Sequence, residues 1–260
     1  MEFFNAAFLG IVEGMTEFLP VSSTGHLILF VDLLNFRAPD GHVFEVVIQL
    51  GAILAIVALY WRKLWDVLRH PFAPSAQHFV RNVLLAFLPA AIIGFFAHDL
   101  IKTALFNPTV VAVALILGGI AILVIERMKP VAVIARTEDM GIKTALAIGF
   151  MQCLAMVPGV SRSGATIMGA LLMKVERKAA AEFSFFLAIP TMLAATSYDL
   201  YKARDTLSAD GLGLIAVGFA VSFVVALLVV RWLVRFVQNH GFGVFAWYRI
   251  ALGAAILLLA

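Results

Sequence analysis

The chain has 260 residues, of which 63% are hydrophobic and 13% are charged, and its formal net charge is +3. A mean hydropathy of +1.01 is too apolar for a soluble fold of this length, so composition excludes a soluble domain and predicts a polytopic membrane protein. The basic residues are scattered over short loops and form no single face, so nucleic acid is not an expected partner.

Six apolar runs approach the ~20 residues that cross a bilayer core. They cover roughly residues 43–61, 83–97, 108–125, 183–198, 212–230 and 244–260. Met1 to Asn5 carry no basic leader or small-residue cleavage site, so the first apolar segment is expected to stay in the mature protein. Cys153 is the single cysteine and has apolar neighbours, which predicts a buried, unreactive thiol and no disulfide.

Lys and Arg residues divide unevenly between the loops that connect the predicted spans. Thirteen fall in four segments, at roughly residues 62–81, 127–143, 174–178 and 231–235. The alternate connections carry four: Arg37, Lys102, Lys202 and Arg204. Because cytoplasmic loops are enriched in Lys and Arg, the thirteen are expected in the cytoplasm and both termini outside.

An ungapped offset of 139 residues aligns the chain with itself. The matches include Gly10 with Gly149, Ser22 with Ser161, Gly25 with Gly164, and Phe44 with Phe183. The alternative is a chance match between two stretches rich in Leu, Ala and Gly. The interpretation is a single membrane domain of two pseudo-repeats, about 1–128 and 141–260, joined by a cytoplasmic linker at about 129–140. If each half begins with a re-entrant helix pair, the second half is inverted relative to the first and the two breaks meet near the midplane.

The first polar break follows two carboxylates in an apolar helix. Glu13 and Glu17 are four residues apart and share one helical face, where each costs roughly 2.5–3.5 kcal/mol to insert. A divalent cation held together with substrate phosphates is the favoured partner, and a proton path is the alternative. Pro20 ends the helix, residues 22–25 supply hydroxyls and a turn, and His26 is suited to proton transfer. The simpler interpretation is a capped helix with a histidine at the interface.

The second polar break, at residues 157–166, surrounds Arg162 with Ser161, Ser163 and Thr166. A guanidinium forks toward phosphate oxygens and the hydroxyls complete a cradle, so this break predicts a phosphate or diphosphate site. The alternative is a structural ion pair between Arg162 and Glu13 or Glu17. Both interpretations bring the breaks together, but only the functional one predicts a space between them.

These motifs resemble those of the undecaprenyl-diphosphate phosphatases, also called the bacitracin-resistance proteins. The resemblance extends over the whole chain, and its most specific parts are Glu13-x-x-x-Glu17 with residues 20–27, and residues 158–166. It implies an all-α fold with six transmembrane helices and two re-entrant helix pairs in inverted repeats. It also implies hydrolysis of undecaprenyl diphosphate to undecaprenyl phosphate and inorganic phosphate, which recycles the lipid carrier for peptidoglycan synthesis and confers bacitracin resistance. The implied location is the bacterial inner membrane, with the active site facing the periplasm and a divalent cation, Mg²⁺ or Ca²⁺, as cofactor.

The resemblance also implies roles for the residues of the two breaks. Glu13 and Glu17 would hold the metal, with Glu17 as a candidate base, and Arg162 would clamp the diphosphate. Ser23 and His26 are the candidates for nucleophile and proton carrier, although attack by activated water is equally open. The remaining hydroxyls would bind phosphate oxygens or tighten the turns: Ser22, Ser161, Ser163 and Thr166.

Three other interpretations complete the sequence-based expectations. A lipid flippase or ion-coupled transporter would use the same inverted-repeat site without cleaving a bond. The membrane lipid phosphatases with a histidine nucleophile are excluded, because Ser22 precedes Ser23 and no second histidine follows residues 161–164. Glu45 and Gln49 are expected outside the site itself, Arg249 is expected in an interfacial belt, and the expected assembly is a homodimer.

Overall fold

The computed structural model describes residues 1–36, 43–105, 107–128, 130–203 and 211–259, and these are helical apart from turns, the connection at 130–141 and one isolated bridge between Ile134 and Val175. The α-helices of the first half are α1 (Glu2–Thr16), α2 (Ser23–Leu33), α3 (Val43–Leu59), α4 (Trp61–Arg69), α5 (Pro74–Leu105) and α6 (Pro108–Met128). Those of the second half are α7 (Ile142–Cys153), α8 (Arg162–Leu172), α9 (Arg177–Ala203), α10 (Leu212–His240) and α11 (Gly243–Leu259). Two 3-10 turns, η1 (Thr137–Asp139) and η2 (Leu154–Met156), flank α7.

The predicted apolar runs fall in α3, α5, α6, α9, α10 and α11. Four helices are long and apolar enough to cross a membrane, namely α5, α6, α9 and α10. α3 continues into α4 through a bend of 69°, and α11 is a shorter apolar helix. The protein is therefore an all-helical, multi-pass membrane protein, while the count of six spans stays a prediction.

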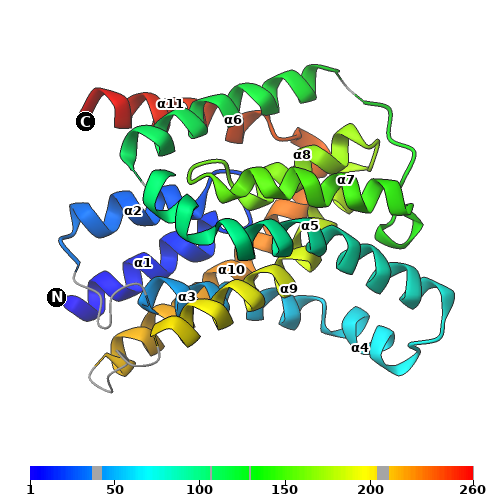
Figure 1. Cartoon of the computed structure of the whole chain (residues 1–260), viewed down its shortest axis with the longest axis horizontal. Coiled ribbons are helices and arrows are strands. Elements are labelled where there is room, and N and C mark those ends of the chain that lie inside the picture. The colour runs from blue at the N-terminus through cyan, green and yellow to red at the C-terminus, as the bar shows by residue number, and fades with distance from the viewer. Residues whose placement is uncertain (37–42, 106, 129, 204–210, 260) are drawn as a thin grey trace.

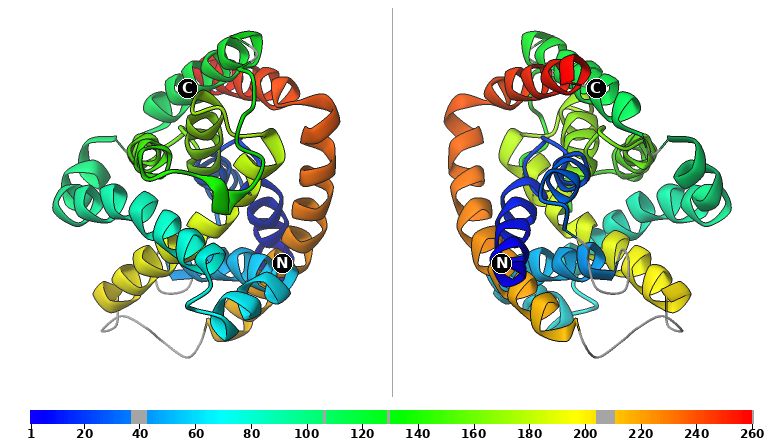
Figure 2. Two further views of the ribbon diagram at one scale, coloured as in Figure 1. Left: turned by 90° about the vertical axis from the view of Figure 1, so that its right-hand side faces the viewer. Right: turned by 90° about the vertical axis from the view of Figure 1, so that its left-hand side faces the viewer.

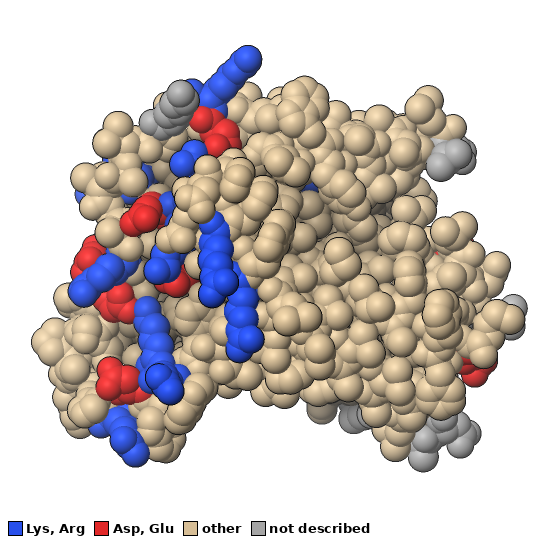
Figure 3. All heavy atoms as spheres, turned by 180° about the vertical axis from the view of Figure 1, so that it is seen from behind, with Lys and Arg blue, Asp and Glu red and all other residues tan. Residues whose placement is uncertain are grey.

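The charged side chains gather at one end of the long axis, the end where α4 lies (Figure 3). The middle of that face shows almost no charged atoms, as a surface in contact with lipid tails requires. α4 lies at this end and has no buried residue, with Trp61 and Trp65 about half exposed. Exposed tryptophans beside basic residues are typical of a membrane boundary.

The four short helices form two pairs that lie toward opposite ends of the long axis, α1 with α2 and α7 with α8 (Figure 1). Seen along that axis, the longer helices surround α2, α8 and the loops that precede them (Figure 2). α1 packs against α10 and α7 packs against α5, so each pair is held by a long helix of the other predicted half. The two halves are thus interlocked, with the breaks enclosed between them.

Packing between α1 and α10 depends on two glycines. A methyl group added at Gly10 would lie 2.5 Å from the carbonyl oxygen of Gly218, and one at Gly14 would lie 2.6 Å from that of Ser222. Both distances are too short for a real carbon atom, so the two backbones touch directly. Small residues of this kind let membrane helices pack without a hydrophobic driving force.

Candidate active site

Both breaks end in the same backbone turn. Ser22 precedes α2 with φ +70° and Ser161 precedes α8 with φ +74°, a backbone region that non-glycine residues rarely adopt. The Oγ of Ser22 accepts a hydrogen bond from the backbone N–H of Gly25 at 3.4 Å, and the Oγ of Ser161 accepts one from Gly164 at 3.1 Å. The 139-residue offset therefore relates two identical helix caps, which supports the predicted repeat. The first N–H groups of α2 and α8 are available to an anion.

An ionic and hydrogen-bonded chain joins the two breaks. One terminal nitrogen of Arg162, Nη2, donates to Oε1 of Glu17 at 2.7 Å, and the Oγ of Ser23 donates to Oε2 of the same carboxylate at 2.5 Å. The side chain of Glu17 is 5% exposed and that of Arg162 is 13% exposed. These three residues were predicted to act together, and the fold brings them into direct contact across 145 positions of sequence.

Arg162 is held in place from α9. Its Nη1 donates to the carbonyl oxygen of Ser184 at 2.9 Å, while Thr166 Oγ1 donates to Ser184 Oγ at 2.7 Å. Ser163 Oγ donates to the carbonyl oxygen of Leu19 at 2.8 Å and so ties α8 to the first break. Thr166 and Ser163 therefore tighten the turns, which was one of the two roles predicted for them. The Nε of Arg162 is buried and has no hydrogen-bond partner among the described residues.

A polar cavity of about 120 Å³ separates the two breaks. Its polar lining comes from both of them: Glu17, Ser22, Ser23, Thr24, Ser161 and Arg162. A space of this size holds several water molecules at about 30 Å³ each, or one small anion. The ion pair alone therefore does not account for the site, because the space that distinguishes the two interpretations of Arg162 is present.

Gln49 of α3 also lines this cavity, although the sequence interpretation left it outside the site. α3 packs against α9 and α10, and this packing turns Gln49 toward the breaks. Gln49 lies four residues after Glu45, near the start of an apolar run. That position in the sequence was compatible with a place inside the site or outside it. Met192, which accepts a hydrogen bond from Arg162 at 3.4 Å, is a further lining residue that the sequence did not indicate.

Glu13 lies beside the cavity and does not line it. It is fully buried, and neither carboxylate oxygen has a hydrogen-bond partner in the part of the chain that is described. Glu17, one helical turn further on, presents another acceptor. Two adjacent carboxylates with an unsatisfied pair of oxygens fit a hard divalent cation that takes its remaining ligands from phosphate and water. The described residues contain no cluster of three or more His, Cys, Asp or Glu, so this pair would be its acidic ligand set.

His26 is also outside the cavity lining. Its Nδ1 lies 2.7 Å from the carbonyl oxygen of Ser22 and its Nε2 lies 2.6 Å from the hydroxyl of Tyr248. A carbonyl only accepts, so Nδ1 carries the proton and Nε2 accepts from Tyr248. Both ring nitrogens are therefore engaged, and in this arrangement the ring joins α2 to α11. Its predicted role as a proton carrier stays a prediction.

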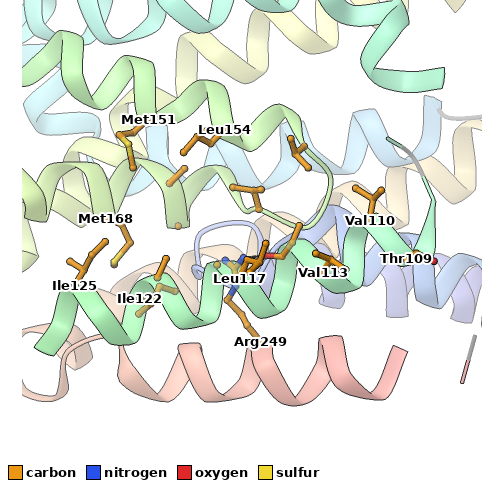
Figure 4. A pocket seen from close by; sticks show the side chains of 17 residues that line it. Thr109, Val110, Val113, Leu117, Ile122, Ile125, Met151, Leu154, Met168 and Arg249 are labelled. Atoms are coloured by element: carbon orange, nitrogen blue, oxygen red, sulfur yellow. Dashed lines mark hydrogen bonds between the residues drawn. The ribbon is translucent and has the colours of Figure 1, made fainter. Parts of the chain in front are cut away.

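Arg249 corrects the expectation of an interfacial belt. It is 1% exposed and donates only to backbone carbonyls. Nη1 bonds to Pro20 O at 3.0 Å, and Nη2 bonds to Gly159 O at 2.9 Å and Ala114 O at 3.2 Å. Figure 4 shows Arg249 reaching from α11 past α6 toward the breaks. The prediction was wrong because Trp247 and Tyr248 resemble a membrane boundary, whereas the helix turns the next residue inward.

Cys153 is a smaller correction, since its side chain is only partly buried. Its Sγ donates to the carbonyl oxygen of Gly149 at 3.3 Å. Apolar neighbours in the sequence predicted burial, but burial depends on the side of the helix that a residue occupies. No chemical role is assigned to this thiol.

The fold and the site together define a polytopic membrane protein with a polar cavity between two helix breaks. The chain belongs to the family described as Bacitracin resistance protein BacA, whose model matches residues 6–255. Among similar proteins, Undecaprenyl-diphosphatase 2 of Paramagnetospirillum magneticum is 55% identical over 98% of both chains. Undecaprenyl-diphosphatase of Parvibaculum lavamentivorans is 56% identical over 98% of this chain and 96% of its own. The enzyme of that name from Nitrosospira multiformis is 57% identical over 97% and 93%.

Proposed function

We propose that this protein hydrolyses undecaprenyl diphosphate to undecaprenyl phosphate and inorganic phosphate. The observation that carries the proposal is the contact of Arg162 and Ser23 with the two oxygens of Glu17 at the edge of a polar cavity. A guanidinium, a carboxylate and a hydroxyl are the groups that phosphoryl transfer needs for clamping, proton removal and attack. Relatives that carry the name undecaprenyl-diphosphatase supply the identity of the lipid.

Arg162 is suited to bind the diphosphate without losing its support. Nη1 is anchored on Ser184, whereas Nε is buried without a partner among the described residues, in a side chain that lines the cavity. Phosphate oxygens would accept from Nε and compete with Glu17 for Nη2. The helix starts at Ser22 and Ser161 add backbone N–H donors from two directions. The negative charge that develops on the leaving phosphate is thereby stabilised by fixed donors in a site with little water.

Ser23 is the favoured nucleophile because its hydroxyl already donates to Glu17 at 2.5 Å. In the first step the Ser23 oxygen bonds to the terminal phosphorus, the bond from that phosphorus to the bridging oxygen breaks, and undecaprenyl phosphate leaves. Glu17 takes the serine proton. Water then attacks the phosphoserine, which releases inorganic phosphate and restores the hydroxyl. In the alternative, Glu17 takes a proton from water, which attacks the same phosphorus directly.

Glu13 and Glu17 would hold a divalent cation, Mg²⁺ or Ca²⁺. The two unpartnered oxygens of Glu13 support this assignment. A cation bound there supplies positive charge that neutralises phosphate oxygens. The charged end of the molecule favours an orientation with α4 in the cytoplasm, and the first break would then open toward the periplasm of a bacterial inner membrane. A homodimer remains a prediction from the sequence.

The test is inorganic phosphate release from undecaprenyl diphosphate by detergent-purified protein, with Mg²⁺, Ca²⁺ or EDTA. Cation-dependent release is expected, and Arg162→Ala and Glu17→Ala should each lower kcat/KM by at least about 100-fold. Arg136→Ala is the control, because Arg136 is exposed and pairs only with Asp139 at the surface. Folded wild-type protein that binds the lipid and releases no phosphate would favour the flippase or transporter alternative instead.

Ser23→Ala separates the two chemical routes. Attack by Ser23 predicts that a substrate labelled in its terminal phosphate leaves label on the wild-type protein after rapid acid quenching, and none on Ser23→Ala. Attack by water predicts no labelled protein in either case. The two routes thus differ in a covalent product and not only in rate.

A further inference from the structure

An apolar groove of about 440 Å³ runs between α5, the end of α7 and α9. Small side chains form much of its wall, among them Ala91, Gly94 and Ala195. Phe95 and Tyr198 meet edge-to-face at 6.5 Å near one end. Ala194 and Ala195 are exposed on the outside of α9, so the groove opens on a side of the protein that faces lipid.

This groove adjoins the polar cavity. Arg162 and Ala155 line both spaces. A molecule that placed a phosphate against Arg162 would therefore have an apolar space beside that phosphate, on the side where the groove lies. A prenyl diphosphate ester has this division between a charged head and an apolar chain.

The junction also contains two unused hydrogen-bond donors. Gln152 is 2% exposed and lines the groove, and its Nε2 has no partner, while its Oε1 accepts from Thr191 Oγ1 at 3.3 Å. The Nε of Arg162 is the second donor without a partner in the described structure. A buried donor left unpaired is costly. An oxygen of a ligand at the head of the groove would give these two donors a partner.

The groove lies beside α7 and α9 of the second half. In the first half, glycines of α1 and α3 bring the corresponding helices into close contact, and in the second half this series of close contacts is interrupted. α7 touches α5 at Gly149, where an added methyl group would lie 2.5 Å from Ala86 O. One turn later lies Cys153, which the 139-residue offset relates to Gly14. The side chain of Cys153 leaves no room for a direct contact between two helix backbones. The helices are therefore held close at one point and leave room beyond it, at Gln152 and Met156.

α9 widens the same space. Gly51 of α3 lets that helix touch α10, since an added methyl group there would lie 2.5 Å from Phe219 O. The 139-residue offset relates Gly51 to Pro190 of α9. Pro190 lies inside the helix and removes one backbone hydrogen bond. The groove residues of α9 begin at the next position, Thr191.

A second apolar groove, of about 490 Å³, lies between α6 and the α7–α8 pair (Figure 4). It shares only Val157 with the polar cavity. Its one charged residue is Arg249, whose Nε, Nη1 and Nη2 all donate to backbone carbonyls. The hydroxyl of Thr109 is the other polar side-chain group in its lining. With its guanidinium engaged by the backbone, this groove is the weaker candidate.

We propose that the groove between α5, α7 and α9 binds the first isoprene units of the substrate's prenyl chain, and that Gln152 donates a hydrogen bond to an oxygen of the diphosphate. This inference rests on the proposed function. It places the prenyl chain in one of the two apolar grooves and gives Gln152 a direct contact with the substrate. Recognition of the prenyl chain is then separate from binding of the diphosphate by Arg162.

Two matched substitutions test this assignment by phosphate release. Ala195→Phe fills the proposed groove, and Ala121→Phe places the same side chain in the groove beside α6. Ala195→Phe should raise KM for undecaprenyl diphosphate at least about tenfold, since displacing an isoprene unit removes several buried methylene groups. Methyl diphosphate, an ester without an isoprene unit, should be affected much less, and Ala121→Phe should leave KM for both substrates within about twofold. The assignment would be overturned by a raised KM for undecaprenyl diphosphate alone in Ala121→Phe. An equal rise in KM for both substrates in Ala195→Phe would also overturn it.

Photocrosslinking tests the groove independently of catalysis. A prenyl diphosphate analogue with a benzophenone on its second isoprene unit should label peptides from residues 87–95 or 191–198, and Ala195→Phe should abolish that labelling. Labelling confined to residues 109–125 would contradict the proposal. If no phosphate is released but the label falls in the expected peptides, the hydrolysis proposal fails while the groove assignment stands. Gln152→Leu should weaken binding of the diphosphate analogue and leave binding of a prenyl alcohol analogue unchanged.

Discussion

Arg249 Nη1 donates a hydrogen bond of 3.0 Å to the carbonyl oxygen of Pro20, which lies in the break between α1 and α2. The same guanidinium donates to Gly159 in the second break and to Ala114 and Leu115 in α6. Broken helices leave backbone carbonyls without partners, and these are costly in a membrane. One permanently charged side chain thus satisfies carbonyls of both breaks and fixes the distance between them.

Replacing Arg249 should therefore damage both stability and activity. Arg249→Leu leaves the carbonyls of Pro20 and Gly159 in the two breaks without this donor, and a loss of at least about 2 kcal/mol in the free energy of unfolding is expected. Arg249→Lys keeps the charge but cannot reach all four carbonyls, so an intermediate loss is expected. Thermal unfolding in detergent measures the first effect and phosphate release the second. An unchanged melting temperature in Arg249→Leu would contradict this account.

Much of the fold follows from patterns that membrane insertion imposes. Long apolar runs predicted the helices α5, α6, α9 and α10, because each run must hydrogen-bond its own backbone inside a bilayer. Glu17 and Arg162 were predicted as site residues because ionisable groups inside the membrane need partners. Their mutual contact is the one that the predicted repeat required, since an inverted second half would bring the two breaks together from opposite ends.

The remaining part of the site depends on helix rotation and packing, which spacing does not reveal. Arg249 lies in an apolar run, and the rule that drew attention to Arg162 applied to it equally. The neighbouring Trp247 and Tyr248 favoured a boundary instead. Gln49 and Gln152 turn inward only because α3 and α7 pack against particular neighbours. The 139-residue offset relates Gln152 to Glu13, a signal that was present in the sequence and was not used.

The paired helix caps predict a specific order of stability. Ser22 and Ser161 combine a side-chain cap with a positive φ angle. Glycine at either position loses the cap but adopts the angle freely, whereas alanine loses the cap and keeps the strain. Ser161→Gly should therefore be more stable than Ser161→Ala by about 1 kcal/mol, and the same order should hold at position 22. Equal melting temperatures for the two Ser161 variants would exclude strain at that turn.

Glu138 predicts a pH-dependent contribution at the charged end. Burial acts to raise the pKa of Glu138, but hydrogen bonds and the charge of Lys63 outweigh it, and the pKa lies below its usual value. A lowered pKa stabilises the fold above the unfolded pKa of about 4.3, and this stabilisation is lost as the pH falls through the folded value. Because both side chains are partly exposed, Glu138→Gln should cost at most about 1 kcal/mol at pH 7 and less at pH 3.5. Asp139→Asn, in an exposed pair with Arg136, should show no measurable change in thermal unfolding at either pH.

Gly10 provides the test of the interlocked halves. A side chain there meets backbone atoms of α10 and not a flexible neighbour, so the helices must separate to admit it. Gly10→Ala is expected to lower the free energy of unfolding by about 1–3 kcal/mol, as overpacking does in well-packed cores. Gly141→Ala is the matched control, because an added methyl group at Gly141 has no heavy atom within 4 Å. Thermal unfolding of both variants in one detergent gives the comparison. If α1 is held mainly by lipid and not by α10, the two variants will have the same melting temperature. Packing of α1 against α10 would then not be what stabilises the first break.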